Sequence, residues 1–239
     1  MAFLDSIRKN KAIPLKNVGD VFRDTTTGPW SITLWPADLG GWMGSYAGRT
    51  VDLISLCMLC KHMNPMVVFE IGTFHGHSAL HLALNAPDDA VVFTLDLPPE
   101  DSSTANLSTT SMDRLIMEYR SEDCVFTGTS VEPKIRRLFG NSALFDFSQY
   151  YGTVDLFFID GAHSYECARS DTLNALRCCH SESVIAWHDY GRRGVNGVSP
   201  WLAELSQHLP IYAVPGGSLA FSLVEEPLQA LKTIGVRIS

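Results

Sequence analysis

The stretch that decides the fold is MVVFEIGTFHGHS, residues 66–78. It opens with a continuous apolar and β-branched run, which is typical of a strand buried on both faces of a sheet. Gly72 and Gly76 follow directly, and glycines permit a tight turn and a close approach of a ligand to the backbone. Residues 77–85 then have helical spacing, and a helix N-terminus offers unpaired N–H groups. The stretch therefore predicts a strand, a ligand-binding loop and a helix.

The same alternation continues along the chain. Apolar runs predict further strands over residues 90–95, 123–128, 154–159 and 183–188. Helical spacing predicts helices over residues 48–62, 111–120, 131–139, 164–179 and 198–209. Two more strands are expected within 211–224, around the hairpin signal Pro215-Gly216-Gly217. The pattern predicts an α/β fold, a doubly wound and mostly parallel sheet with helices on both faces.

The first 47 residues differ from the rest, because they combine prolines and glycines with a series of aromatic residues. These aromatic residues are Trp30, Trp35, Trp42 and Tyr46. We predict an irregular N-terminal cap over residues 1–47, with one short helix near residues 2–9, and an α/β domain over residues 48–239. The aromatic side chains either line a substrate pocket or pack the cap onto the domain.

Composition narrows the classes of partner. The 239 residues include 26 acidic and 18 basic side chains, which give a net charge of −8 and no basic footprint for nucleic acid. No apolar run approaches the length of about 20 residues that spans a membrane. Cys57 and Cys60 have no second CxxC pair to complete a metal site, so we interpret them as helix-packing residues. We therefore expect a cytoplasmic protein that binds neither nucleic acid nor membrane.

Ligands of doubly wound sheets bind beyond the carboxyl ends of the strands, so the residues that follow each strand are the candidates. Asp96 ends the second predicted strand, where a carboxylate either accepts the hydroxyls of a ribose or caps a turn. Thr129 and Ser130 follow the third predicted strand and suit the edge of an adenine. Ser130 equally suits the N-cap of the next helix.

Two carboxylates and two histidines follow the fourth and fifth predicted strands. Asp160 and His163 follow residues 154–159, and His188 and Asp189 come at the end of the strand over 183–188. The carboxyl ends of parallel strands meet at one edge of a sheet, so we expect these four side chains to converge.

Four segments, in this order, resemble the class I S-adenosylmethionine-dependent methyltransferases. They are EIGTFHGHSALHLAL (70–84), TLDLPPE (94–100), FFIDGAHSYECARSD (157–171) and IAWHDY (185–190). The resemblance covers about residues 66–224 and leaves the N-terminal 47 residues unmatched. It is strongest to the bacterial group with IDGxHxY and HDY motifs, which includes small-molecule O-methyltransferases and cephalosporin-hydroxylase-like proteins.

The resemblance implies a Rossmann-like sheet of seven strands in the order 3-2-1-4-5-7-6, with an antiparallel seventh strand. It also implies a binding site for S-adenosylmethionine. The residues expected to hold this cofactor are Glu70, Gly72, Thr73, Gly76, Ser78, Asp96, Leu97, Thr129, Ser130, Asp160 and His163. By the same resemblance, Asp160 and Asp189 occupy the strand ends where catechol-type relatives place Mg²⁺ ligands, with His188 as a softer neighbour. Mg²⁺ dependence is left open, because catechol-type relatives have Asp-Asn after the fifth strand, whereas here Asp189 precedes Tyr190.

The resulting hypothesis is methyl transfer from S-adenosylmethionine to a small-molecule acceptor, with oxygen as the expected acceptor atom. His163 is predicted as the general base or as an orienting residue, and Asp160 and His188 complete the catalytic group. The acceptor pocket is expected from residues 1–47, 98–110 and 190–200, and the sequence leaves a homodimer open.

Two alternatives are an oxidoreductase or hydroxylase-like enzyme and a non-catalytic cofactor-binding module. The GxxxG spacing disfavours a dinucleotide. The polar cluster argues against a pure binder, which has little use for paired carboxylates and histidines.

Overall fold

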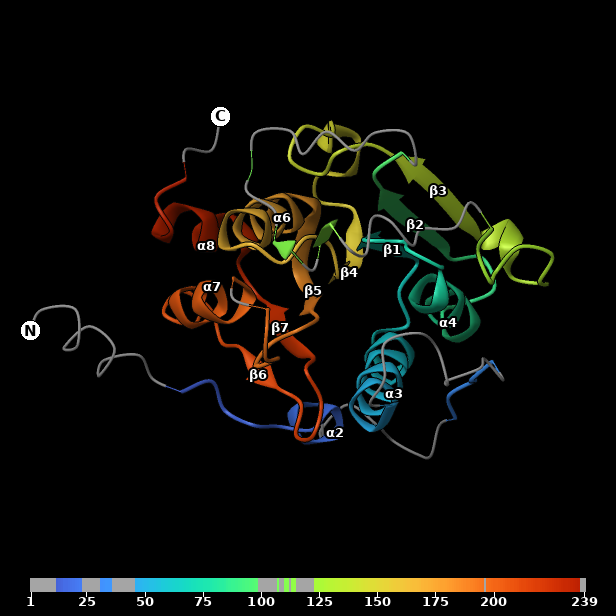
Figure 1. Ribbon diagram of the computed structural model, residues 1–239, viewed down its shortest axis with the longest axis horizontal. Coiled ribbons are helices and arrows are strands. Elements are labelled where there is room, and N and C mark those ends of the chain that lie inside the picture. Colours follow the sequence, from blue (N-terminus) through green and yellow to red (C-terminus); the bar gives the residue numbers. More distant parts are fainter. Residues whose placement is uncertain are drawn as a thin grey trace, which may run out of the picture.

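The computed structural model describes residues 12–22, 31–35, 46–98, 107, 110–111, 113–114, 123–195 and 197–236. Its centre is a seven-stranded sheet with the order β3-β2-β1-β4-β5-β7-β6 (Figure 1). The strands are β1 Val67–Ile71, β2 Val91–Asp96, β3 Ile135–Phe139, β4 Val154–Ile159, β5 Cys179–Trp187, β6 Tyr212–Ala213 and β7 Ala220–Val224. Neighbours from β3 to β5 pair in parallel, and β7 is antiparallel to β5 and β6. The predicted fold class and strand order are confirmed.

Helices cover both faces of this sheet. Helix α3 (Tyr46–Met63) and helix α4 (His77–Asn85) share one apolar core with the short α2 (Val18–Val21). On the other face lie α6 (Tyr165–Cys178), α7 (Val198–Leu205) and α8 (Pro227–Thr233), as Figure 1 shows. Two single 3₁₀ turns, η1 (Glu132–Lys134) and η2 (Ser148–Tyr150), lie on either side of β3 in the sequence.

Two tryptophan side chains in the core beneath α6, α7 and α8 share one threonine hydroxyl. Trp187 at the end of β5 and Trp201 on α7 both direct their indole N–H groups to the Thr172 hydroxyl on α6, each at 2.9 Å. The hydroxyl in turn donates to the Ala168 carbonyl at 2.7 Å. All three side chains are buried, so a single oxygen satisfies two indole groups and joins β5, α6 and α7.

The prediction for the third strand and the following helix is wrong. Residues 123–130 form turns, and the strand is β3, within the stretch 131–139 that the spacing assigned to a helix. Pro133 lies in the single 3₁₀ turn η1, after which the chain extends and pairs in parallel with β2 from Val92↔Ile135 to Asp96↔Phe139. The apolar residues of 123–128 have another use, since Cys124 and Phe126 are buried against the loop after β1.

The N-terminal predictions are only partly within the described residues. The expected helix near residues 2–9, Trp30, Trp42, the side chain of Tyr46 and most of the expected helix 111–120 lie outside them. The segment 31–35 lies along α4, where Asn85 bonds both backbone groups of Thr33 and His81 Nε2 accepts the Trp35 N–H. Residues 14–16 pair with Ala213 of β6.

The structure bears on the expectations for the cysteines and for membrane-spanning segments. All six cysteines are buried free thiols, and Cys57 and Cys60 pack in the core from α3, as predicted. In the part of the chain that the structure describes, no helix combines the length and the apolar character needed to cross a membrane.

Candidate active site

The loop after β1 is built on two glycines that no other residue could replace without strain. Gly72 has φ +99°, and a Cβ there would lie 2.1 Å from the Asp160 carbonyl oxygen. Gly76 has φ +76°, precedes α4 directly, and a Cβ there would lie 2.5 Å from the Phe126 ring. The left-handed conformations and the close backbone approach both require glycine. The loop therefore lies directly against the end of β4.

Asp96 joins this loop to the end of β2. Its Oδ2 accepts the Phe74 N–H at 3.0 Å, and its Oδ1 accepts the Leu97 N–H at 2.9 Å. This is the turn-capping role that the sequence left open for Asp96. These two hydrogen bonds leave further acceptor positions open on the Asp96 carboxylate, because its two oxygens offer about four and the side chain is only half-buried.

Glu70 lies beneath the loop as a fully buried carboxyl group. Its Oε2 accepts the Thr94 hydroxyl at 2.5 Å. Burial raises the pKa of Glu70 to about 8; hydrogen bonding from Ser78 and Thr94 opposes this rise, and the Asp160 and Asp96 carboxylates add to it. Glu70 is therefore mainly protonated at neutral pH.

We expect the free energy of unfolding to fall as pH rises between about 5 and 8, partly because of Glu70. Its pKa is about 8 in the folded protein and 4.5 ordinarily, so the folded state holds the extra proton in this window. The slope from one such group is at most about 1.4 kcal/mol per pH unit. Urea unfolding at pH 5.5, 7.0 and 8.5 measures it, and Glu70→Gln should flatten the profile. An equally steep profile in the variant would contradict this assignment.

A charged cluster occupies the carboxyl ends of β4 and β5. His163 is buried, with Nδ1 2.5 Å from Asp113 Oδ1 and Nε2 2.5 Å from Asp189 Oδ2. A carboxylate only accepts hydrogen bonds, so both ring nitrogens must donate and the ring is an imidazolium. Burial alone would lower the pKa of His163, but the two carboxylates outweigh it and raise the pKa to about 10.

The second histidine of the cluster is also held between carboxylates. His188 Nδ1 lies 3.0 Å from Asp160 Oδ1, and Nε2 lies 3.2 Å from Asp52 Oδ2. Burial opposes protonation, but these carboxylates and Asp189 raise the pKa of His188 well above its usual value. Asp189 Oδ1 also receives Arg192 Nη1 at 2.7 Å. Although burial acts in the opposite sense, His163 and His188 hold the pKa of Asp189 far below its usual range.

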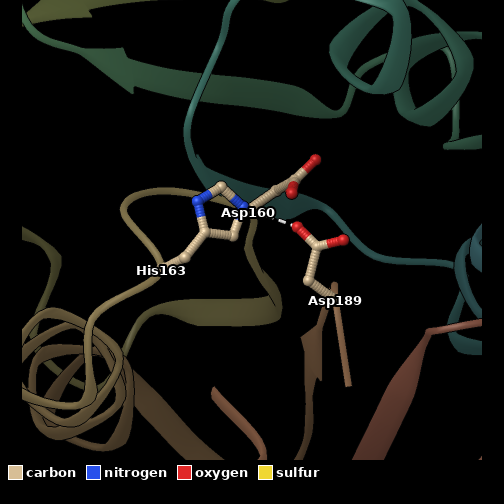
Figure 2. A group of neighbouring side chains, drawn as sticks. All are labelled: Asp160, His163 and Asp189. Carbon is tan, nitrogen blue, oxygen red and sulfur yellow. Dashed lines mark hydrogen bonds and ion pairs between the residues drawn. The ribbon is translucent and has the colours of Figure 1, made fainter. Parts of the chain in front are cut away.

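Figure 2 shows how Asp160, His163 and Asp189 face one another from neighbouring strand ends. One ligand-type atom from each of these three residues lies within 4.8 Å of the others. The structure thus brings together all four side chains that were expected to converge here, because His188 contacts both Asp160 and Asp189.

The third strand does not lie where the adenine expectation for Thr129 and Ser130 placed it. Both precede β3 instead of following it, the Thr129 hydroxyl bonds the Phe126 carbonyl, and Ser130 caps no helix. The residues that follow β3 are Gly140, Asn141 and Ser142, and the Gly140 N–H bonds the Asp96 carbonyl.

Three members of the cluster escaped the sequence analysis. Asp113 had a readable signal, because Thr110 and Asp113 form a capping box in which each side chain bonds the other's backbone N–H, at 2.6 and 3.2 Å. Asp52 lies on α3 and accepts the Ser218 and Leu219 N–H groups of the β6–β7 turn. Arg192 gave no signal, since it follows the HDY motif on an irregular loop.

Comparisons with known proteins agree with this architecture. No curated protein matches the sequence. Among solved structures, the methyltransferase PaMTH1 from Podospora anserina with bound SAH has a TM-score of 0.55 at 16% identity, covering 80% of this chain and 83% of that one. The O-methyltransferase from Bacillus cereus in complex with SAH has a TM-score of 0.52 at 16% identity, covering 93% and 97%. A cofactor-bound protein from MTB has a TM-score of 0.53 at 20% identity, covering 78% and 84%.

These structural likenesses show the fold. The family follows from the sequence itself, because the profile of a family described as a methyltransferase domain matches residues 69–190, half of the chain. The match begins within β1, includes the glycine loop, Asp96 and the whole charged cluster apart from Asp52 and Arg192, and ends just after Asp189. The chain belongs to this methyltransferase-domain family.

Proposed function

We propose that this methyltransferase takes its methyl group from S-adenosylmethionine and transfers it to an oxygen of a small molecule, at the carboxyl edge of β1, β2, β4 and β5. The observation that carries the proposal is the arrangement of Asp96. This carboxylate fastens the positive-φ glycine loop to the end of β2 and keeps acceptor capacity for two vicinal hydroxyls. The SAH-bound structures of similar fold support the same donor.

The residues of this edge fit the parts of the donor. Gly72, Thr73, Gly76 and Ser78, with Glu70 beneath them, would receive the methionine end at the N-terminus of α4. Asp96 and Leu97 would hold the ribose. We assign the adenine to the loop after β3, at Asn141 and Ser142, in place of Thr129 and Ser130. When bound, the donor supplies an activated methyl group, so the protein's main contribution is alignment, worth about 7–11 kcal/mol.

Asp160 is the residue that we assign to the acceptor proton. Its side chain is 31% exposed, and only its Oδ1 pairs with the cluster, through His188. His163 is a poorer general base, because both of its ring nitrogens already donate to carboxylates. We therefore assign His163 and His188 to orienting Asp189 and Asp160. Residues 98–110 and 190–200 and the N-terminal cap would shape the acceptor pocket.

Asp96→Asn should weaken the binding of S-adenosylhomocysteine at least about tenfold, a loss of about 1.4 kcal/mol. The amide keeps one acceptor oxygen and the size of the side chain, but it loses the charge and one of the two acceptor oxygens. Isothermal calorimetry measures the affinity, and thermal unfolding reports whether the loop still folds. Asp88→Asn, at an exposed carboxylate beyond α4, is the matched control. Unchanged affinity in the Asp96 variant would remove the ribose assignment.

The acceptor class is tested with methyl-labelled S-adenosylmethionine and panels of phenols, aliphatic alcohols and amines. We expect label in the methyl ethers of hydroxyl compounds. Label that enters amines alone would overturn the oxygen assignment while leaving the donor assignment intact.

A further inference from the structure

Three cationic side chains lie where the catechol-type resemblance implies a divalent ion. They are His163, His188 and Arg192, and all three contact the carboxylates that were predicted as metal ligands. We propose that these three side chains supply the positive charge at the ends of β4 and β5 in place of a divalent metal ion, so that methyl transfer in this protein is metal-independent. The inference rests on the proposed function, because it concerns the same methyl transfer. Its test measures metal binding and does not require that reaction.

The spacing of the donors does not fit Mg²⁺. The ion demands near-octahedral geometry at 2.0–2.1 Å, which places neighbouring ligand atoms about 2.9 Å apart. His163 Nε2 and Asp189 Oδ2 are 2.5 Å apart, which is the distance of a hydrogen bond and leaves no room for shared coordination. Asp189 Oδ1 is also engaged, at 2.7 Å from Arg192 Nη1. Both oxygens of the expected central ligand are therefore bonded to protein cations.

The positive charge of the two rings follows from the carboxylates around them. Both His163 ring nitrogens are hydrogen-bonded to carboxylates. The His188 nitrogens lie 3.0 Å from Asp160 and 3.2 Å from Asp52 as ion pairs, and its Nδ1 makes no hydrogen bond among the described residues. An imidazolium is a poor metal ligand, because a ring nitrogen that carries a proton has no lone pair to offer. The rings thus act as cations here and not as ligands.

The charge of the cluster supports the same conclusion. Its carboxylates are Asp52, Asp113, Asp160 and Asp189. Against these four negative charges stand three positive ones, which leaves a single negative charge near Asp160. One monovalent cation balances that charge, whereas a divalent ion would leave the buried site positive. A sulfonium carries the matching charge.

Two buried carboxylates from outside the sheet hold the rings in place. Asp113, in the capping box with Thr110, fixes the Nδ1 side of His163, and its Oδ1 also accepts the His163 backbone N–H at 3.1 Å. Asp52 on α3 lies behind His188 and is anchored by Ser218 and Leu219. Because Asp113 contacts His163 and Asp52 contacts His188, we assign both carboxylates to positioning the imidazolium rings.

The test is a titration of the intact protein with Mn²⁺, followed by electron paramagnetic resonance, with and without S-adenosylhomocysteine. We expect no site tighter than the millimolar range, and weak binding that Asp189→Asn leaves unchanged. One equivalent of Mn²⁺ bound in the micromolar range, and lost in Asp189→Asn, would overturn the proposal. The affinity for S-adenosylhomocysteine in the same samples reports separately on the proposed function.

A variant that should gain metal binding tests whether positive charge excludes the ion. His188→Asp removes one positive charge and adds an oxygen ligand beside Asp160, so it should bind Mn²⁺ at least tenfold more tightly than the parent protein. His208→Asp, at a half-buried position in the turn after α7, is the matched control and should gain nothing. Thermal unfolding identifies variants that fold. A folded His188→Asp protein without any gain would contradict the exclusion of metal by charge, and His188→Gln then separates the loss of positive charge from the added ligand.

Discussion

Asp189→Asn should lower the free energy of unfolding by about 3–5 kcal/mol. Asp189 is only 2% exposed and contacts His163, His188 and Arg192, three groups that carry positive charge. Removing the one carboxylate that these cations share leaves two buried imidazolium rings undercompensated. Urea unfolding at pH 7 measures the loss.

The control for this prediction is Glu225→Gln, which changes the same charge at an exposed position after β7 and should stay within about 0.5 kcal/mol of the parent. Lowering the pH does not rescue Asp189→Asn, because both rings are already protonated. If Asp189→Asn were as mild as Glu225→Gln, the cluster could not be the network of paired charges that its distances indicate.

Thr172→Val should cost at least about 2 kcal/mol, although the two side chains have nearly the same shape. The substitution deprives the Trp187 and Trp201 indole N–H groups of their shared acceptor, and each unsatisfied buried donor costs about 1–3 kcal/mol. Because these indoles belong to β5 and α7, the strand that ends in the charged cluster would lose its attachment to the helical layer.

Thr172→Ser separates the hydroxyl from the methyl group. Serine keeps the acceptor and loses one buried methyl group, so it should be less destabilising than valine. Thermal and urea unfolding of both variants give the comparison. A valine variant more stable than the serine variant would mean that burial of the methyl group, and not the shared oxygen, stabilises this junction.

The elements that the sequence predicts well are those with an unambiguous period. The strands Val67–Ile71 and Val154–Ile159 are apolar apart from one acidic residue each, and the sequence assigned both correctly as buried central strands. The prediction of a hairpin at Pro215-Gly216-Gly217 is also correct, because proline and glycine favour a turn at that position. The convergence of Asp160 with Asp189 then follows from topology alone, because parallel neighbouring strands end at one edge.

The third strand was mispredicted because its physical determinants are not local. Ile135–Phe139 reads IRRLF and lies at the edge of the sheet, where only one side pairs and two arginines are tolerated. Cys124 and Phe126 are apolar because they pack under Gly76, and not because they belong to a strand. The error shifted the residues expected to follow the third strand from Asn141 and Ser142 to Thr129 and Ser130.

The partners of the cluster were hidden for a different reason. Asp52 and Asp113 lie 108 and 50 residues before Asp160 and His163 respectively, so only the folded chain brings them to the histidines. These two carboxylates change the chemical interpretation of the site. Two histidines beside two aspartates predict a general base and a metal ion. With four aspartates around them, the two histidines are imidazolium cations.

The central claim is that the carboxyl edge of β1 and β2 binds a sulfur-linked adenosine. Calorimetric titration of the purified protein with S-adenosylhomocysteine, and in parallel with NADH, tests it without knowledge of the acceptor. We predict one equivalent of S-adenosylhomocysteine bound with micromolar affinity and no heat from NADH. Binding of NADH with no response to S-adenosylhomocysteine would contradict the account.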